Sequence, residues 1–80
     1  MNQTCEDRII SIKSKLMSGV ADYKSKNNLT QREVGLRCGI DQARVSRLLN
    51  GEFDKFTIDQ LIKITYRLGI ELKLLSLAEK

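Results

Sequence analysis

Residues 30–51 have the sequence TQREVGLRCGIDQARVSRLLNG, in which four arginines stand against two acidic residues and Gly39 separates two apolar-periodic segments. Thr30 followed by Glu33 forms the S/T-x-x-E pattern of a capping box, so a helix is expected to begin here. Gly39 can adopt the left-handed conformation that ends a helix, and Asp41 can cap the next one. The segment therefore predicts two short helices joined by a tight turn, which is a helix-turn-helix arrangement.

Helical periodicity continues on both sides of this segment. Before it, one apolar stripe predicts a helix from about residue 5 to residue 27, formed by Ile9, Ile12, Leu16, Val20 and Tyr23. After it, Thr57 and Gln60 form a second capping box, and the helix that they open is stopped by Gly69. The core positions expected from the spacing are Leu16, Val20, Val34, Cys38, Ile40, Val45, Leu48, Leu61, Ile64 and Leu68. We therefore expect one all-α domain over residues 1–80, with its helix-turn-helix unit at 31–50.

The segment after Gly69, IELKLLSL, alternates apolar and charged residues as a strand does. A lone strand cannot satisfy its own backbone, so the expected partner is the same segment of a second copy, paired antiparallel about a two-fold axis. A fifth helix is the rival interpretation, because Glu, Leu, Lys and Ala are good helix formers. In both cases the apolar residues need cover, which predicts a homodimer with an interface at Ile70, Leu72 and Leu74.

The bulk composition favours an anionic partner. The 14 Lys and Arg residues against 10 Asp and Glu residues give a net charge of +4 and a pI near 9.3. Nucleic acid is the leading candidate, and a membrane surface is the alternative. With no run of 18 apolar residues and no signal-peptide pattern at the start, a cytoplasmic protein without a membrane segment is expected.

The side-chain inventory argues against an enzyme. The chain has no His, which removes Ser-His-Asp and Cys-His catalytic sets, and it has neither zinc-ligand spacing nor a Gly-rich phosphate loop. We therefore expect no catalytic residue, no metal and no cofactor. Cys5 and Cys38 are interpreted as reduced thiols, with Cys38 in the core and a regulatory disulfide as the alternative.

The helix-turn-helix segment resembles the XRE family of phage-repressor and Cro-like DNA-binding domains. The resemblance rests on the opening Thr30–Gln31, the turn glycine Gly39 and the run SRLLNG at residues 46–51. One position departs from the family pattern: Gly35 stands where the two helices cross and where Ala is usual, at an expected cost to the helix of about 1 kcal/mol. The sequence GEFDKFTIDQLIKITYRLGIELKL is also similar to the HigA-like antitoxin branch. That resemblance implies autorepression and an adjacent ribonuclease toxin as a second partner.

A recognition helix enters the major groove with its N-terminal end first, which exposes the outward side chains of residues 41–47 to base edges. Gln42 can bond adenine N6 and N7 together, and Ala43 is short enough to admit a thymine methyl group. Arg47 can pair with guanine O6 and N7. These three residues are the predicted base contacts.

Phosphate contacts need donors around the groove. The candidates are Gln31, Arg44, Ser46, Asn50 and Lys55, and the resemblance places Gln31 and Asn50 at backbone-contacting positions. The adjacent exposed arginines of the first short helix are interpreted as solvated.

Together these features predict a sequence-specific DNA-binding regulator. The leading hypothesis is a homodimeric repressor of its own operon, whose recognition helices lie about 34 Å apart on a palindromic operator. The first alternative is an antitoxin that also neutralises a ribonuclease toxin. Apolar surface at Ile9, Ile10 and Ile12 could hold that toxin, although simple core packing explains the same residues. The second alternative is a protein-interaction module that does not bind DNA.

Overall fold

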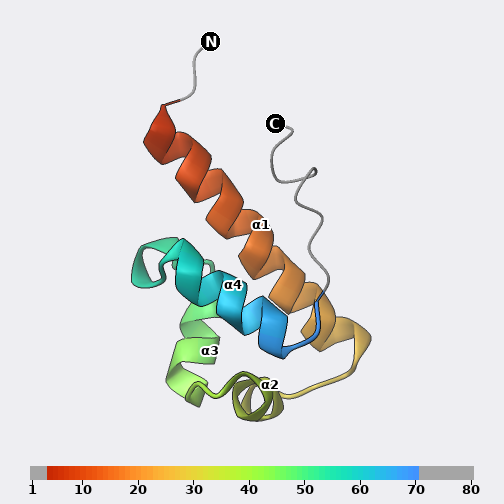
Figure 1. Cartoon of the computed structure of the whole chain (residues 1–80). Helices are drawn as coiled ribbons and strands as arrows, with labels where there is room; N and C mark the ends of the chain where they lie inside the picture. The colour runs from red at the N-terminus through yellow and green to blue at the C-terminus, as the bar shows by residue number, and fades with distance from the viewer. Residues whose placement is uncertain (1–3, 71–80) are drawn as a thin grey trace.

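The computed structural model describes residues 4–70, and this part of the chain is helical between its turns (Figure 1). The elements are α1 (Cys5–Lys26), α2 (Gln31–Cys38), α3 (Gln42–Leu49), the 3-10 turn η1 (Phe53–Lys55) and α4 (Ile58–Arg67). The expected all-α fold is confirmed, and the described residues form four of the four or five expected helices. Of the proposed dimer residues, Ile70 is the last described residue, whereas Leu72 and Leu74 lie outside the described range.

The helix boundaries follow from local capping chemistry. The Thr30 hydroxyl accepts a hydrogen bond from the Glu33 amide at 3.1 Å, and the Glu33 carboxylate accepts one from the Thr30 amide at 2.8 Å. Gly39 ends α2 with φ 77°, in the left-handed region that favours glycine. The Asp41 carboxylate then accepts from the Arg44 amide at 2.8 Å and opens α3. Both helices of the motif therefore begin and end where the sequence predicts.

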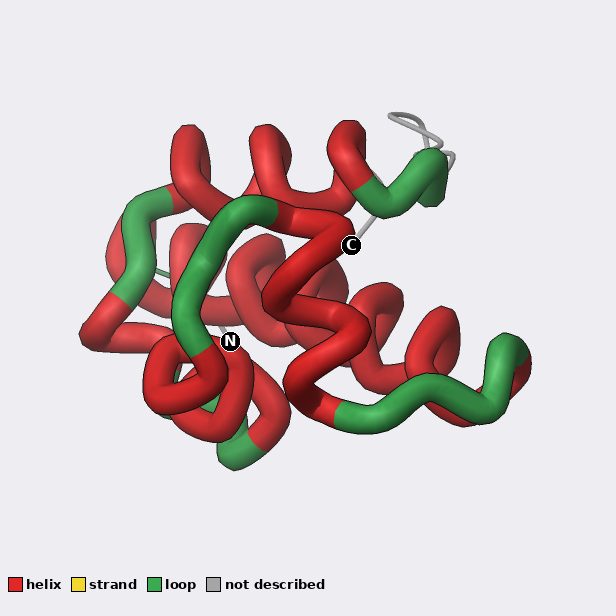
Figure 2. Tube along the Cα trace, turned by 90° about the horizontal axis from the view of Figure 1, so that it is seen from below, coloured by secondary structure: helices red, strands yellow, loops and turns green. Residues whose placement is uncertain are grey.

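The helices pack around one core (Figures 1 and 2). α4 runs beside the C-terminal half of α1, and α2 and α3 pack together beneath this pair. The buried apolar side chains are Leu16, Met17, Val20, Val34, Cys38, Val45, Leu48, Phe56, Leu61, Ile64 and Leu68. Nine of the ten residues predicted to form the core are buried, and Ile40 is half-buried against it. The core thus fixes the orientation of α3 through Val45 and Leu48.

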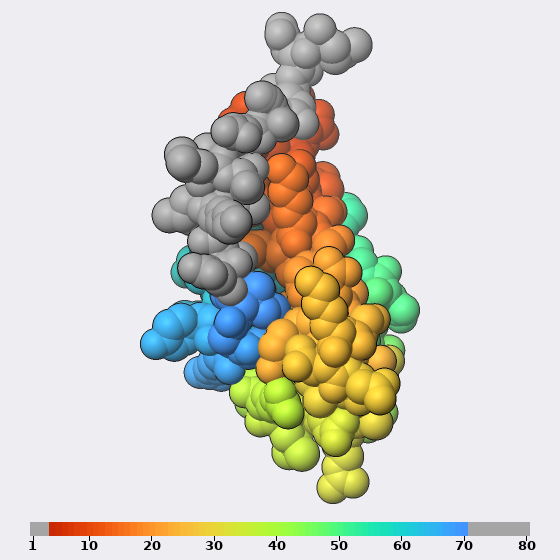
Figure 3. Space-filling view, turned by 90° about the vertical axis from the view of Figure 1, so that its right-hand side faces the viewer, coloured from red at the N-terminus to blue at the C-terminus, as the bar shows by residue number. Residues whose placement is uncertain are grey.

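Helix α1 extends beyond this core at its N-terminal end (Figure 1). Ile12 packs against the core, but Ile9 is 36% exposed. At the other end of α1, the space-filling view shows the helix and the following loop lying directly against the end of α4 (Figure 3). Of the five residues of the predicted apolar stripe, Ile9 therefore lies outside the core, and the other four belong to it or pack against it.

Gly35 lies where α2 meets the turn and α3. Its backbone is closer to the turn than an alanine side chain would allow. A Cβ atom at this position would lie 2.6 Å from the Ile40 carbonyl oxygen and 3.3 Å from Cγ2 of Val45. The Gly35 carbonyl also accepts hydrogen bonds from the amides of Gly39 and Ile40, at 2.8 and 3.0 Å. The glycine is therefore matched to the tight turn, and its unfavourable helix propensity is offset by the close approach that it permits.

Candidate nucleic-acid interface

Helix α3 presents a polar face away from the core. At 100° per residue, the buried pair Val45 and Leu48 places Ala43, Arg47 and Asn50 on the opposite side of the helix. These three residues are exposed, and so is Gln42 in the first turn. This face therefore holds Ala43 and Arg47, two of the three predicted base contacts, while the exposed Gln42 lies beside it in the first turn of the helix.

The side chains of Gln42 and Arg47 are unengaged within the described part of the chain. Neither forms a hydrogen bond, an ion pair or a ring contact with another residue of the range 4–70. Arg47 carries five N–H donors and Gln42 carries an amide donor and acceptor, so both can bond an external partner without breaking an internal contact.

The two margins of α3 are half-buried and more constrained. The guanidinium carbon of Arg44 lies 4.5 Å from the centroid of the Phe56 ring, which is a cation–π contact. Phe56 is itself in the core, so this contact fixes Arg44 on the flank of α3 that faces α4. Ser46 is half-buried on the other margin. Arg44 thus lies beside the outward face of the helix rather than at its centre.

The other predicted phosphate contacts lie before and after α3. Gln31 is the first residue of α2 and is half-buried, at a helix N-terminus whose backbone amides are suited to anions. Asn50 caps the C-terminal end of α3, and Lys55 ends η1; both are exposed. The structure therefore supplies polar groups on both sides of the recognition helix along the chain.

A second cluster of positive charge, which the sequence prediction did not include, lies on α4. Lys63 and Arg67 are four residues apart, so they share one face of the helix. With Arg44 they line a groove of about 200 Å³, whose remaining lining residues are Ile40, Gln60 and Ile64. We call these six residues the basic groove. The four α4 residues have i, i+3, i+4, i+7 spacing, so the sequence alone could have placed them on one helix face. The position of Arg44 beside that face depends on how α3 packs against α4, which the sequence does not show.

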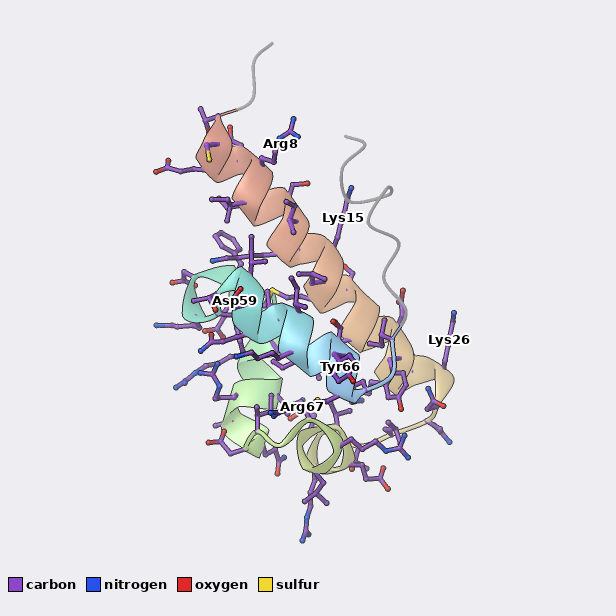
Figure 4. All side chains as sticks on the ribbon, in the orientation of Figure 1. Arg8, Lys15, Lys26, Asp59, Tyr66 and Arg67 are labelled. Carbon is purple, nitrogen blue, oxygen red and sulfur yellow. The ribbon has the colours of Figure 1, made fainter. Side chains whose placement is uncertain are left out.

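Arg67 also connects α4 to the end of α2. Its Nη1 donates a hydrogen bond to the Cys38 carbonyl oxygen at 2.9 Å, and Figure 4 shows its side chain directed from α4 toward the motif. Carbonyl groups in the last turn of a helix lack intrahelical partners, so this bond satisfies one of them. Burial raises the pKa of the adjacent Cys38 thiol, and the positive charge of Arg67 opposes this effect.

The two arginines of α2 lie at its surface. Arg32 and Arg37 are both exposed, as a solvated face predicts. Arg37 donates from Nη1 to the Tyr23 hydroxyl at 2.7 Å and so connects α2 to α1.

Two short helices joined at a left-handed glycine, with the second exposing polar side chains, define a helix-turn-helix module. The chain matches the family model described as a helix-turn-helix domain over residues 3–75. It therefore belongs to the helix-turn-helix domain family. Membership of this family suggests that the protein is a DNA-binding regulator. No curated protein and no solved structure is significantly similar to it. Among residues 4–70, no helix combines the length and apolar character needed to cross a membrane.

Proposed function

We propose that this protein is a sequence-specific transcription regulator that represses its own operon by binding operator DNA as a homodimer. Helix α3 enters the major groove, where Gln42, Ala43 and Arg47 contact base edges. Gln31, Arg44, Ser46, Asn50 and Lys55 contact the phosphate backbone around that groove. A DNA target also accords with a cytoplasmic protein.

The observation that carries this proposal is the outward face of α3. Its polar side chains are exposed and unengaged within residues 4–70, on a helix whose opposite face is anchored by Val45 and Leu48. A face that served only to solubilise the domain would not need a bidentate amide and a guanidinium at positions that reach a groove floor.

The proposal is tested by selecting preferred sequences from random duplex DNA and measuring affinities by fluorescence anisotropy. Arg47→Ala should weaken binding to the selected site by about 1–3 kcal/mol and relax discrimination at one base pair. Lys55→Ala should weaken binding to selected and random DNA alike. If the two variants lose the same affinity on both DNAs, the assignment of roles is wrong. If no duplex binds, the module acts through protein contacts instead.

The homodimer is proposed to form through the segment that follows Gly69, with Ile70, Leu72 and Leu74 at its interface. Of these three residues, Ile70 is half-buried and also packs against the core of its own chain. Analytical ultracentrifugation of Leu74→Lys at tens of micromolar should show a monomer. Glu71→Lys, which introduces the same side chain on the other side of the predicted strand, should remain a dimer. Two dimers would place the interface elsewhere, such as on α1 or α4.

A second candidate function, that of an antitoxin, is favoured by one observation on α1. Ile9 and Ile10 line a groove of about 400 Å³ together with Phe53, beyond the part of the helix that the core uses. The lining also contains the charged residues Glu6, Lys13 and Asp54, and an apolar patch bordered by charged groups is suited to a protein partner. The test is coexpression with the product of an adjacent reading frame: Ile9→Glu should abolish copurification and toxin neutralisation while leaving DNA affinity unchanged. An adjacent frame that yields no bound partner would remove this candidate.

A further inference from the structure

The basic groove concentrates positive charge without an acidic neighbour in its lining. Arg44 approaches it from α3, and Lys63 and Arg67 approach it from α4, while its other lining residues are an amide and two isoleucines. Like charges around one small groove repel each other, and an anion placed among them removes that repulsion. The groove therefore has the electrostatic character of an anion site.

Two of the three cations are held in place before any ligand arrives. The guanidinium carbon of Arg44 lies over the Phe56 ring, and Arg67 uses Nη1 to bond the Cys38 carbonyl oxygen. The ring contact uses no N–H donor of Arg44, and the hydrogen bond uses one of the five N–H donors of Arg67. Side chains that are already ordered lose little conformational entropy when they bind a ligand, so the free-energy cost of binding an anion here is reduced.

Lys63 supplies the mobile charge of the groove. Its side chain is exposed and makes no hydrogen bond, ion pair or ring contact within the described residues 4–70. A lysine ammonium acts as a point charge that can move toward a bound oxygen, whereas the arginines offer planar donor geometry. Its substitution should therefore change anion binding without changing a structural contact.

The size of the groove suits a small anionic group. Its volume of about 200 Å³ is smaller than the roughly 300–1,000 Å³ of sites that enclose a drug-sized molecule. Arginine forks match the oxygens of phosphate, and a phosphate group is compact enough to enter without a ring following it. The chemistry thus favours a phosphate group over a carboxylate-bearing metabolite of larger size.

We propose that the basic groove is a phosphate-binding site that extends the interface of this module from α3 onto α4. Because Arg44 belongs to both α3 and the groove, the expected source is a backbone phosphate of the DNA that α3 contacts. This source rests on the proposed function. A free phosphorylated molecule would present the same group, and the experiment has an arm for each source.

The first arm measures the salt dependence of DNA affinity for wild type, Lys63→Gln and Lys26→Gln. Lys26 is an exposed lysine at the far end of α1, directed away from the motif, and it serves as the matched control (Figure 4). Each phosphate contact contributes about 0.9 to the slope of log affinity against log salt, which at 0.1 M salt is about eightfold in affinity per protomer. Lys63→Gln should lose this amount, and Lys26→Gln should match wild type.

The second arm titrates wild type and Lys63→Gln with inorganic phosphate at constant ionic strength, followed by ¹H–¹⁵N NMR. Saturating shifts at Gln60, Lys63 and Arg67 that vanish in Lys63→Gln support the site. Such shifts without a change in the DNA salt slope identify a free phosphorylated molecule as the source. An unchanged slope and no saturating shift would overturn the proposal. A protein that binds no DNA would refute the proposed function, and the phosphate titration would then decide the groove alone.

Discussion

Replacing Gly35 by alanine should destabilise the domain, although alanine is the better helix former. The added Cβ would lie 2.6 Å from the Ile40 carbonyl oxygen, and ordinary contact begins at 3.4 Å, so the turn would have to move by about 0.8 Å. That carbonyl belongs to a turn fixed by two hydrogen bonds to the Gly35 carbonyl oxygen, so it cannot rotate away freely.

The magnitude follows from two opposing terms. Overpacking typically costs about 1–3 kcal/mol, and a backbone clash in a fixed turn belongs in the upper half of that range. The gain in helix propensity returns about 1 kcal/mol. We expect a net loss of about 1–2 kcal/mol, and each 1 kcal/mol lowers the Tm of a domain this size by about 4–8 °C.

Gly19 is the matched control, because it also lies inside a helix but a Cβ there would meet nothing within 4 Å. Gly19→Ala should stabilise the domain by about 0.5–1 kcal/mol. Thermal and urea unfolding, followed by far-UV circular dichroism, measure both variants. If Gly35→Ala raises the Tm as Gly19→Ala does, the close approach of α2 to the turn is wrong.

Three further predictions concern contacts within the domain. Thr30→Ala should lose about 1 kcal/mol of unfolding free energy in urea because the α2 cap is removed, whereas Thr30→Ser should keep most of it; equal values for both would contradict the capping box. Burial raises the pKa of the Cys38 thiol, so its contribution is fully present below the ordinary thiol pKa of about 8.5 and is lost as the pH rises through the raised value. The difference in unfolding free energy between wild type and Cys38→Ala should therefore shrink between pH 7.5 and 10, and a constant difference would refute this. Arg67→Met should cost about 1 kcal/mol by removing the bond to the Cys38 carbonyl, and an unchanged urea midpoint would show that this bond does not hold α4 to α2.

Features set by neighbouring residues were predictable from the sequence. The capping box of Thr30 and Glu33, the left-handed Gly39 and the Asp41 cap each depend on side chains within three residues of the backbone that they satisfy. Such contacts leave a fixed spacing in the sequence. The helix-turn-helix unit could therefore be placed nearly residue by residue.

Features set by packing between distant segments were not predictable in the same way. Phe56 lies between η1 and α4, outside any helix, so helical periodicity could not indicate that it is buried. Its ring nevertheless lies in the core and contacts Arg44. Ile9 fits the α1 stripe but is partly exposed, since periodicity does not indicate where the other helices end. The closeness of Gly35 to Ile40 likewise depends on how the two helices cross.

In α3, the residues that stabilise the fold are different from the residues proposed to select the DNA target. Gln42, Ala43 and Arg47 can each be exchanged at little cost to folding, since surface substitutions away from structural contacts usually change stability by no more than about 0.5 kcal/mol. The scaffold can thus be inherited unchanged while its target preference diverges. Duplicated copies of such a gene could acquire separate targets through a few substitutions on this one helix face, without passing through an unfolded intermediate in their evolution.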